Sequence, residues 1–202
     1  MKNSKIFVLL LTMLLAFTIL TGCSQIGTSS EISFKDMADR QITLEQPATK
    51  IVAITAADCE ILYAIGAGDT LVGKGEYCDY PNDITDVKTV QSGSETNIEQ
   101  IIALKPQVVL MSKMDQTDAQ ITKLENAGIK VVVSYAQNIE GVYTDIEMIG
   151  KVTGESDNAS ALIKEMKTSF AKITADSTKS DKTVYFEVSP LEYGHWTAGS
   201  NT

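Results

Sequence analysis

Short apolar runs alternate along this chain with longer segments in which apolar residues recur every three or four positions. Four runs are typical of strands covered on both faces, and they lie at 51–54, 71–73, 107–111 and 129–133. Four segments have the periodicity of helices packed by one face, and they lie at 59–65, 98–104, 118–127 and 139–153. Because strands joined by helices lie parallel, this alternation predicts an α/β fold with a Rossmann-like parallel sheet.

Elements of a different kind flank the alternating region. Ile32–Lys35 and Gln41–Leu44 enclose a polar turn, which predicts a β-hairpin on the sheet edge. A long amphipathic helix is predicted from Asp157 to about Ala175, roughly 27 Å in length. Its apolar stripe consists of Leu162, Met166, Phe170 and Ile173.

A further strand, which would begin a new sheet, is predicted at Thr183–Val188, and no later element of this chain can pack on it. We therefore expect a first lobe at 31–154, a linking helix at 155–176 and the first strand of an incomplete second lobe at 177–202. Residues from Ile32 to about Ala175 should fold, whereas Lys182–Thr202 should be mobile or wrongly packed in this chain, because the strand at Thr183–Val188 has an unpaired edge.

Two predicted helices begin with a residue suited to capping. Asp58 precedes the apolar positions Ile61, Leu62 and Ile65, and is most simply a helix cap. Asn97 precedes the helix at 98–104, and Gln100 is placed for a capping box.

The loops Thr55–Asp58 and Lys74–Pro81 follow two neighbouring parallel strands, so both should face one crevice. Ligands of open α/β sheets bind at such a crevice. A small polar loop beside an aromatic loop predicts a binding site without an obvious catalyst. Lys74 is the only basic residue in these loops, so they offer little positive charge to an anionic ligand.

The chain begins as a secretion signal. Lys2 and Lys5 precede an almost unbroken apolar run at 6–20, which is short for a membrane-spanning helix. The next four residues, Leu20-Thr21-Gly22-Cys23, resemble the lipobox of bacterial lipoproteins. That resemblance implies a signal peptide at 1–22, acylation of Cys23 and a tether at 23–30, which anchors the protein to the outer face of the cell membrane.

The net charge of the chain after the signal limits the partners that it can bind. The signal carries two lysines and no acid, which leaves 15 basic and 26 acidic side chains and a net charge of −11. This acidic balance argues against nucleic acid or anionic lipid as a partner. About 175 remaining residues are enough for one domain with a proper core.

Two further cysteines, Cys59 and Cys78, lie in the loops expected to meet. An exported protein meets oxidising surroundings, where a disulfide between them is an option. The alternative is two free, buried thiols.

Several segments together resemble the ABC-transporter substrate-binding proteins whose two lobes are joined by one long helix. The order of segments carries the resemblance: the hairpin, Lys50-Ile51-Val52, Glu60, Ile65-Gly66-Ala67-Gly68, Leu71-Val72-Gly73, Tyr77-Cys78-Asp79-Tyr80-Pro81, 97–106 (NIEQIIALKP) and Trp196-Thr197-Ala198-Gly199. Such proteins carry vitamin B12, ferric siderophores or haem, and they continue for a further lobe.

This resemblance implies roles for individual residues. Tyr77 matches the aromatic position that contacts the ligand, although a tyrosine can also pack under its own loop. Trp196 would face the cleft from the second lobe or lie in that lobe's core, and Asp58 is a weaker candidate for ligand contact. Glu99 matches the surface acid that pairs with arginines of the transporter. The lone His195 is more simply a surface or core residue than a metal ligand.

The function implied is an extracytoplasmic solute-binding lipoprotein, not an enzyme, that delivers a metal-chelate solute to ABC permease subunits without a cofactor or resident metal. The G-x-S-x-G, P-loop and H-E-x-x-H patterns are missing from the sequence. Two alternatives stay open: a sensory lipoprotein for the same solutes, and an exported α/β enzyme using carboxylates such as Asp58 and Asp79.

Overall fold

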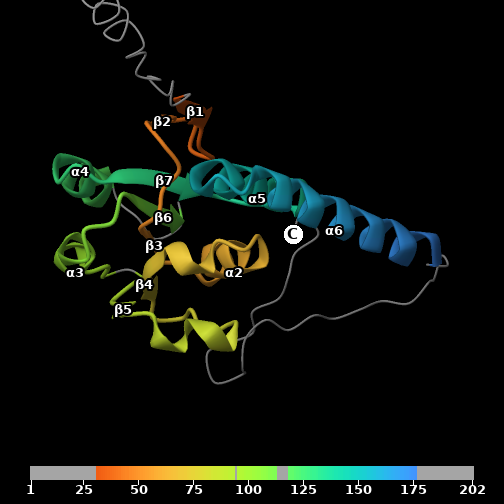
Figure 1. Ribbon diagram of the computed structural model, residues 1–202, viewed down its shortest axis with the longest axis horizontal. Helices are drawn as coiled ribbons and strands as arrows, with labels where there is room; N and C mark the ends of the chain where they lie inside the picture. Colours follow the sequence, from red (N-terminus) through yellow and green to blue (C-terminus); the bar gives the residue numbers. More distant parts are fainter. Residues whose placement is uncertain (1–30, 94, 113–117, 177–202) are drawn as a thin grey trace, which may run out of the picture. The chain divides into compact units, whose positions relative to one another are not determined.

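A computed structural model describes residues 31–93, 95–112 and 118–176 (Figure 1). The predicted signal peptide, Cys23, the tether, the strand at Thr183–Val188, His195 and Trp196 lie outside the described residues. The strands are β1 (Ile32–Lys35), β2 (Gln41–Leu44), β3 (Ile51–Ala53), β4 (Leu71–Gly75), β5 (Thr89–Val90), β6 (Val108–Ser112) and β7 (Lys130–Ser134). The α-helices are α2 (Ala56–Ala64), α3 (Ile98–Ala103), α4 (Asp118–Asn126), α5 (Ile139–Thr153) and α6 (Ser156–Asp176), and short 3-10 helices lie at Gly68–Thr70 and Asn82–Asp86.

Five parallel strands form the main sheet, in the order β5-β4-β3-β6-β7. This is the 3-2-1-4-5 succession of a Rossmann-like sheet, so the predicted α/β fold is confirmed. The chain leaves β3 first toward β5 and later toward β7, which places the topological switch point between β3 and β6. The sequence pattern missed β5, because two residues are too short to show an apolar run.

Alternate residues of the strands face two separate cores. Ile51, Ala53 and Leu110 pack with α2 and α5 on one face. On the other face, Val52 and Val109 pack against α3 and α4. Both faces are therefore covered, as the unbroken apolar runs predicted.

The hairpin β1–β2 forms with the predicted bounds, but as a two-stranded sheet of its own beside edge strand β7. Its turn docks on that strand: the Met37 amide donates to the carbonyl of Val133 at 3.0 Å, and the Val133 amide donates to Asp36 at 3.2 Å. The carboxylate of Asp36 also accepts from the Arg40 guanidinium at 2.9 Å. One backbone hydrogen bond and the side chain of Asp36 thus take the place of the ladder by which the hairpin would extend the sheet.

One of the two predicted caps is wrong. The N-cap of α2 is Thr55, whose hydroxyl accepts from the amide of Asp58 at 3.2 Å. Asn97 caps α3 as predicted, and its side chain accepts from the amide of Gln100 at 3.1 Å. The Gln100 side chain instead accepts from the Gln91 amide, so the capping box is only half formed.

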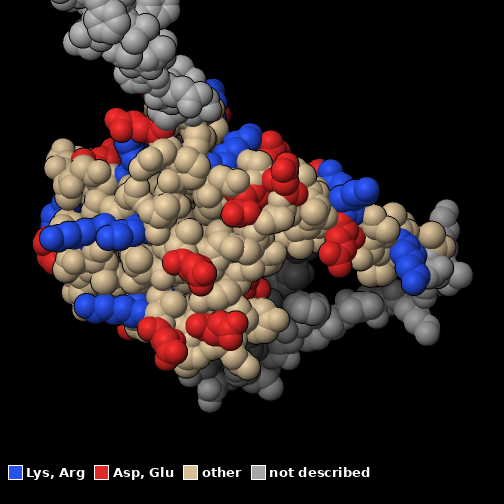
Figure 2. All heavy atoms as spheres, in the orientation of Figure 1, with Lys and Arg blue, Asp and Glu red and all other residues tan. Residues whose placement is uncertain are grey.

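Helix α6 has 21 residues, and its far end extends beyond the sheet and the other helices (Figure 1). Leu162 and Met166 pack against the core, whereas Phe170 and Ile173 are exposed. Acidic and basic side chains are interspersed on the face drawn in Figure 2. Among the described helices, none is both long and apolar enough to cross a membrane.

Candidate functional site

All five parallel strands end at the same edge of the sheet, and the topological switch point lies there between β3 and β6. Loops that follow β3, β4 and β7 gather there, and this is the edge at which α/β sheets bind ligands. The loop after β4 presents two exposed aromatic rings: Tyr77 and Tyr80 are 76% and 65% exposed. An exposed pair of aromatic rings offers apolar area with hydroxyl groups for hydrogen bonding.

Buried contacts hold the tyrosine loop in place. The ammonium group of Lys74 donates to the carbonyl of Cys78 at 2.8 Å, and the Cys78 amide donates to the carbonyl of Gly75 at 3.2 Å. A side chain at Gly75 would have its Cβ 2.3 Å from the carbonyl oxygen of Ile54, so only glycine permits this approach of β4 to β3. Lys74 is buried, so it is not the cationic group of an open cleft that the sequence suggested.

The loops after β3 and β4 meet, as predicted, at their two cysteines. Cys59 and Cys78 are both buried, and both are free thiols, so the suggested disulfide is not formed. The hydrogen bond between the thiols is the main reason that the pKa of Cys59 is raised and that of Cys78 lowered. Packing of α2 against the loop, not a covalent link, joins them.

Asp58 is a buried carboxylate in the first turn of α2. Its side chain is fully buried, and this burial raises its pKa to about 6 against the opposing effect of hydrogen bonds to Thr55 and Ser134. The Ser134 hydroxyl donates to one carboxylate oxygen at 3.1 Å. The other oxygen, Oδ1, has no hydrogen-bond partner in the described part of the chain.

A second buried carboxylate, Asp145 of α5, lines a cavity of about 160 Å³ at this edge. Burial, and then the charge of Asp58, raise the pKa of Asp145 to about 8. Its Oδ1 also lacks a partner among the described residues. The sequence contains a signal for this residue, because Asp145 interrupts an apolar helical stripe between Val142 and Ile149.

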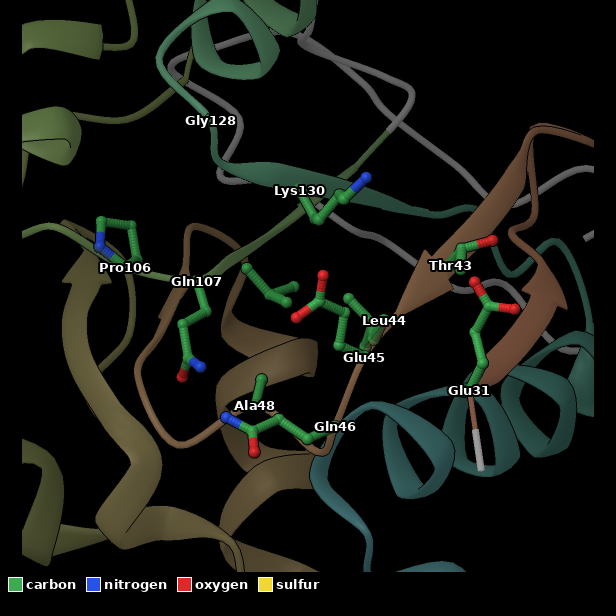
Figure 3. A pocket seen from close by; sticks show the side chains of 11 residues that line it. Glu31, Thr43, Leu44, Glu45, Gln46, Ala48, Pro106, Gln107, Gly128 and Lys130 are labelled. Carbon is green, nitrogen blue, oxygen red and sulfur yellow. The ribbon is translucent and has the colours of Figure 1, made fainter. Parts of the chain in front are cut away.

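A cavity of about 510 Å³ opens at the opposite edge of the sheet (Figure 3). Glu31 and Thr43 line it from the hairpin, and Pro106 and Gln107 from the start of β6. The side-chain oxygen of Gln107 accepts hydrogen bonds from the amides of Thr49 and Lys50, so it already has partners within the fold. This cavity lies at the amino ends of the strands, away from the edge where the tyrosines stand.

Glu99 lies in the first turn of α3, with its side chain 79% exposed. Lys123 approaches it at 3.9 Å, a contact that leaves the carboxylate available to a partner. Within the described ranges, no group of three or more His, Cys, Asp or Glu side chains is arranged to hold a metal ion.

Known proteins are similar to this chain in sequence and in fold. The uncharacterized ABC transporter substrate-binding lipoprotein YvrC of Bacillus subtilis (strain 168) is 32% identical, over 94% of this chain and 66% of the relative. A vitamin B12-binding protein of Vibrio campbellii is 28% identical, over 69% of this chain and 51% of its own length. The crystal structure of a possible iron-binding (periplasmic solute-binding) protein from Staphylococcus epidermidis superposes with a TM-score of 0.66 at 29% identity, over 78% of this chain and 62% of that one.

This chain thus spans between half and two thirds of the length of these relatives. A model of the family described as periplasmic binding protein matches residues 51–202. With the Rossmann-like sheet and its binding edge, this match shows that the chain belongs to the periplasmic binding protein family.

Proposed function

We propose that this protein is the solute-binding component of an ABC importer and captures a metal-chelate solute outside the cytoplasm. The observation that carries the proposal is the pair of exposed rings, Tyr77 and Tyr80, at the carboxyl edge of the sheet. The names of relatives support it, since one is an ABC transporter substrate-binding lipoprotein and another binds vitamin B12.

Among metal chelates, we favour a corrinoid over a ferric siderophore. Siderophore anions call for cationic groups in the cleft, and the nearby Lys74 is buried and hydrogen-bonded to a backbone carbonyl. A corrinoid or haem macrocycle presents a flat face, which an exposed tyrosine ring covers well. Tyr77 is our first candidate for solute contact, and Trp196 is the candidate from the residues after 176.

Delivery needs a membrane anchor and a docking surface. Cys23 would carry the acyl chains that hold the protein on the outer face of the membrane, with 24–30 as a spacer. Glu99 would pair with a basic group of the permease, because its side chain is exposed in the first turn of α3.

Titration of the purified protein with cyanocobalamin, haemin and ferrichrome, followed by tryptophan fluorescence, tests the proposal. We expect saturable binding of one macrocycle. Tyr77→Ala should weaken it about tenfold, the effect of about 1.4 kcal/mol, and Tyr77→Phe should retain most of the affinity because the ring remains. Failure of all three solutes to bind, or equal binding by Tyr77→Ala, would contradict it.

A further inference from the structure

The cavity of about 160 Å³ lies at the topological switch point of the sheet. Thr55 and Ala57 line it from the loop and helix after β3, Ser112 from the end of β6, and Ser134 from the end of β7. A macrocycle is far too large for this space, but a small ion with part of its hydration shell fits.

Two carboxylates stand at this cavity with unused acceptor oxygens. Asp145 lines the cavity directly. Ser134 also lines it, and its hydroxyl donates a hydrogen bond to Asp58, which lies behind it. Asp58 is 0% and Asp145 4% exposed, and Oδ1 of each has no partner among the described residues. Buried carboxylate oxygens are costly unless a proton, a donor or a cation satisfies them.

No cation forms an ion pair with Asp58 or Asp145 within the described part of the chain. Lys74 is nearby, but its ammonium group donates to the carbonyl of Cys78 and not to either carboxylate. The other titratable groups facing the pair are the thiols of Cys59 and Cys78 and the phenol of Tyr135, none of which is cationic.

We propose that Asp145, backed by Asp58 and Ser134, forms a subsite for a compact monovalent cation, either an alkali ion or an ammonium group. Carboxylate and hydroxyl oxygens are hard donors, which suit such cations better than transition metals. The cation competes with the proton that the carboxyl pair otherwise retains near neutral pH. The subsite does not depend on the identity of the main solute.

Thermal unfolding of the purified protein tests the subsite. Melting temperatures are compared at pH 8.5 in 150 mM KCl, NaCl, NH₄Cl, methylammonium chloride or choline chloride, the last being too bulky for the cavity. We expect the compact cations to raise the melting temperature by several degrees over choline, by mass action on the folded state. At pH 5 the difference should vanish, because protons then occupy the carboxyl pair.

The variant Asp145→Asn, which keeps the shape but removes the charge, should lose the cation effect, and the exposed control Asp86→Asn should keep it. A rise with methylammonium alone would assign the subsite to an ammonium group of a solute, whereas a rise with the inorganic ions assigns it to a free ion. Equal melting temperatures in all five salts at pH 8.5 would overturn the proposal. The carboxyl pair of Asp58 and Asp145 would then be satisfied by a proton and not by a cation. An undiminished effect in Asp145→Asn would overturn it as well.

Discussion

Gly150 of α5 and Ala159 of α6 touch so closely that a Cβ on Gly150 would lie 2.6 Å from the Cβ of Ala159. Ala159 is 1% exposed, so this contact lies inside the packing of the two helices. The small size of both residues therefore sets how near α6 lies to α5, and with it the path of the long helix away from the sheet.

Changing Gly150→Ala should lower the free energy of unfolding by about 1–3 kcal/mol through overpacking. In an ordinary helix interior the same change stabilises by about 1 kcal/mol, so the sign of the effect is diagnostic. Chemical denaturation measures it, with the neighbouring exposed Lys151→Ala as the control. A stabilised Gly150→Ala would show that α6 does not pack against α5 at this distance.

Asp36 should be the most sensitive residue of the hairpin. Its fully buried carboxylate accepts from the Ala38 and Arg40 amides, from the Arg40 guanidinium and from the Val133 amide. Asp36→Ala leaves the three amides without this acceptor and removes one of the partners of the Arg40 guanidinium, which keeps Glu125 and the Val131 carbonyl, and this should cost about 3 kcal/mol. Asp39→Asn, at an exposed side chain of the same turn, should cost well under 1 kcal/mol in the same denaturation experiment. Equal losses would mean that the turn does not dock on β7.

Asp145 should make stability fall as the pH rises. Its pKa is about 8 in the folded protein and 3.8 as a reference for the unfolded chain, so the folded state holds the extra proton between these values. The free energy of unfolding in choline buffer should therefore decrease from about pH 4 to about pH 8. Asp145→Asn should match the wild type near pH 4 and exceed it by at most about 6 kcal/mol at pH 9, since the pKa differs by about 4 units and one unit is about 1.4 kcal/mol. Parallel pH profiles for the two proteins would refute the burial of this charge.

Cys23→Ala should release the protein from membranes into the medium, because acylation at this residue is the proposed anchor. Fractionation of cells expressing either form, probed with an antibody, measures the distribution. Cys59→Ala serves as the control, since that thiol is buried in the core. If Cys23→Ala stays membrane-bound with its signal uncut, the lipobox interpretation fails.

Glu99→Arg should leave solute affinity nearly unchanged and reduce uptake, because a charge pair with the transporter becomes a repulsion. Glu147→Arg on α5 is a matched charge reversal at another exposed site. Binding titrations and radiolabelled uptake, run on both variants, separate the two effects. Equal loss of binding and uptake in Glu99→Arg would place the residue in the solute site.

Local order along the chain was readable from the sequence alone. The hairpin strands Ile32–Lys35 and Gln41–Leu44 and the helix Ile139–Thr153 have their predicted bounds. Such elements are specified by neighbouring residues, through apolar periodicity and caps such as Asn97, so no distant contact is needed to find them. The parallel sheet also follows, because helical connections leave little choice of strand direction.

Tertiary structure alone decided what the site contains. Asp58 meets Ser134 although 76 positions separate them, and the cap role that the sequence assigned to Asp58 belongs to Thr55. The side chain of Lys74 points inward and donates to the carbonyl of Cys78. Asp145 of α5 lies close enough to Asp58 of α2 for the charge of Asp58 to raise its pKa. These contacts depend on strand order and on which end of each element is buried. Apolar periodicity reports which face of an element is buried, but not which distant side chains meet there.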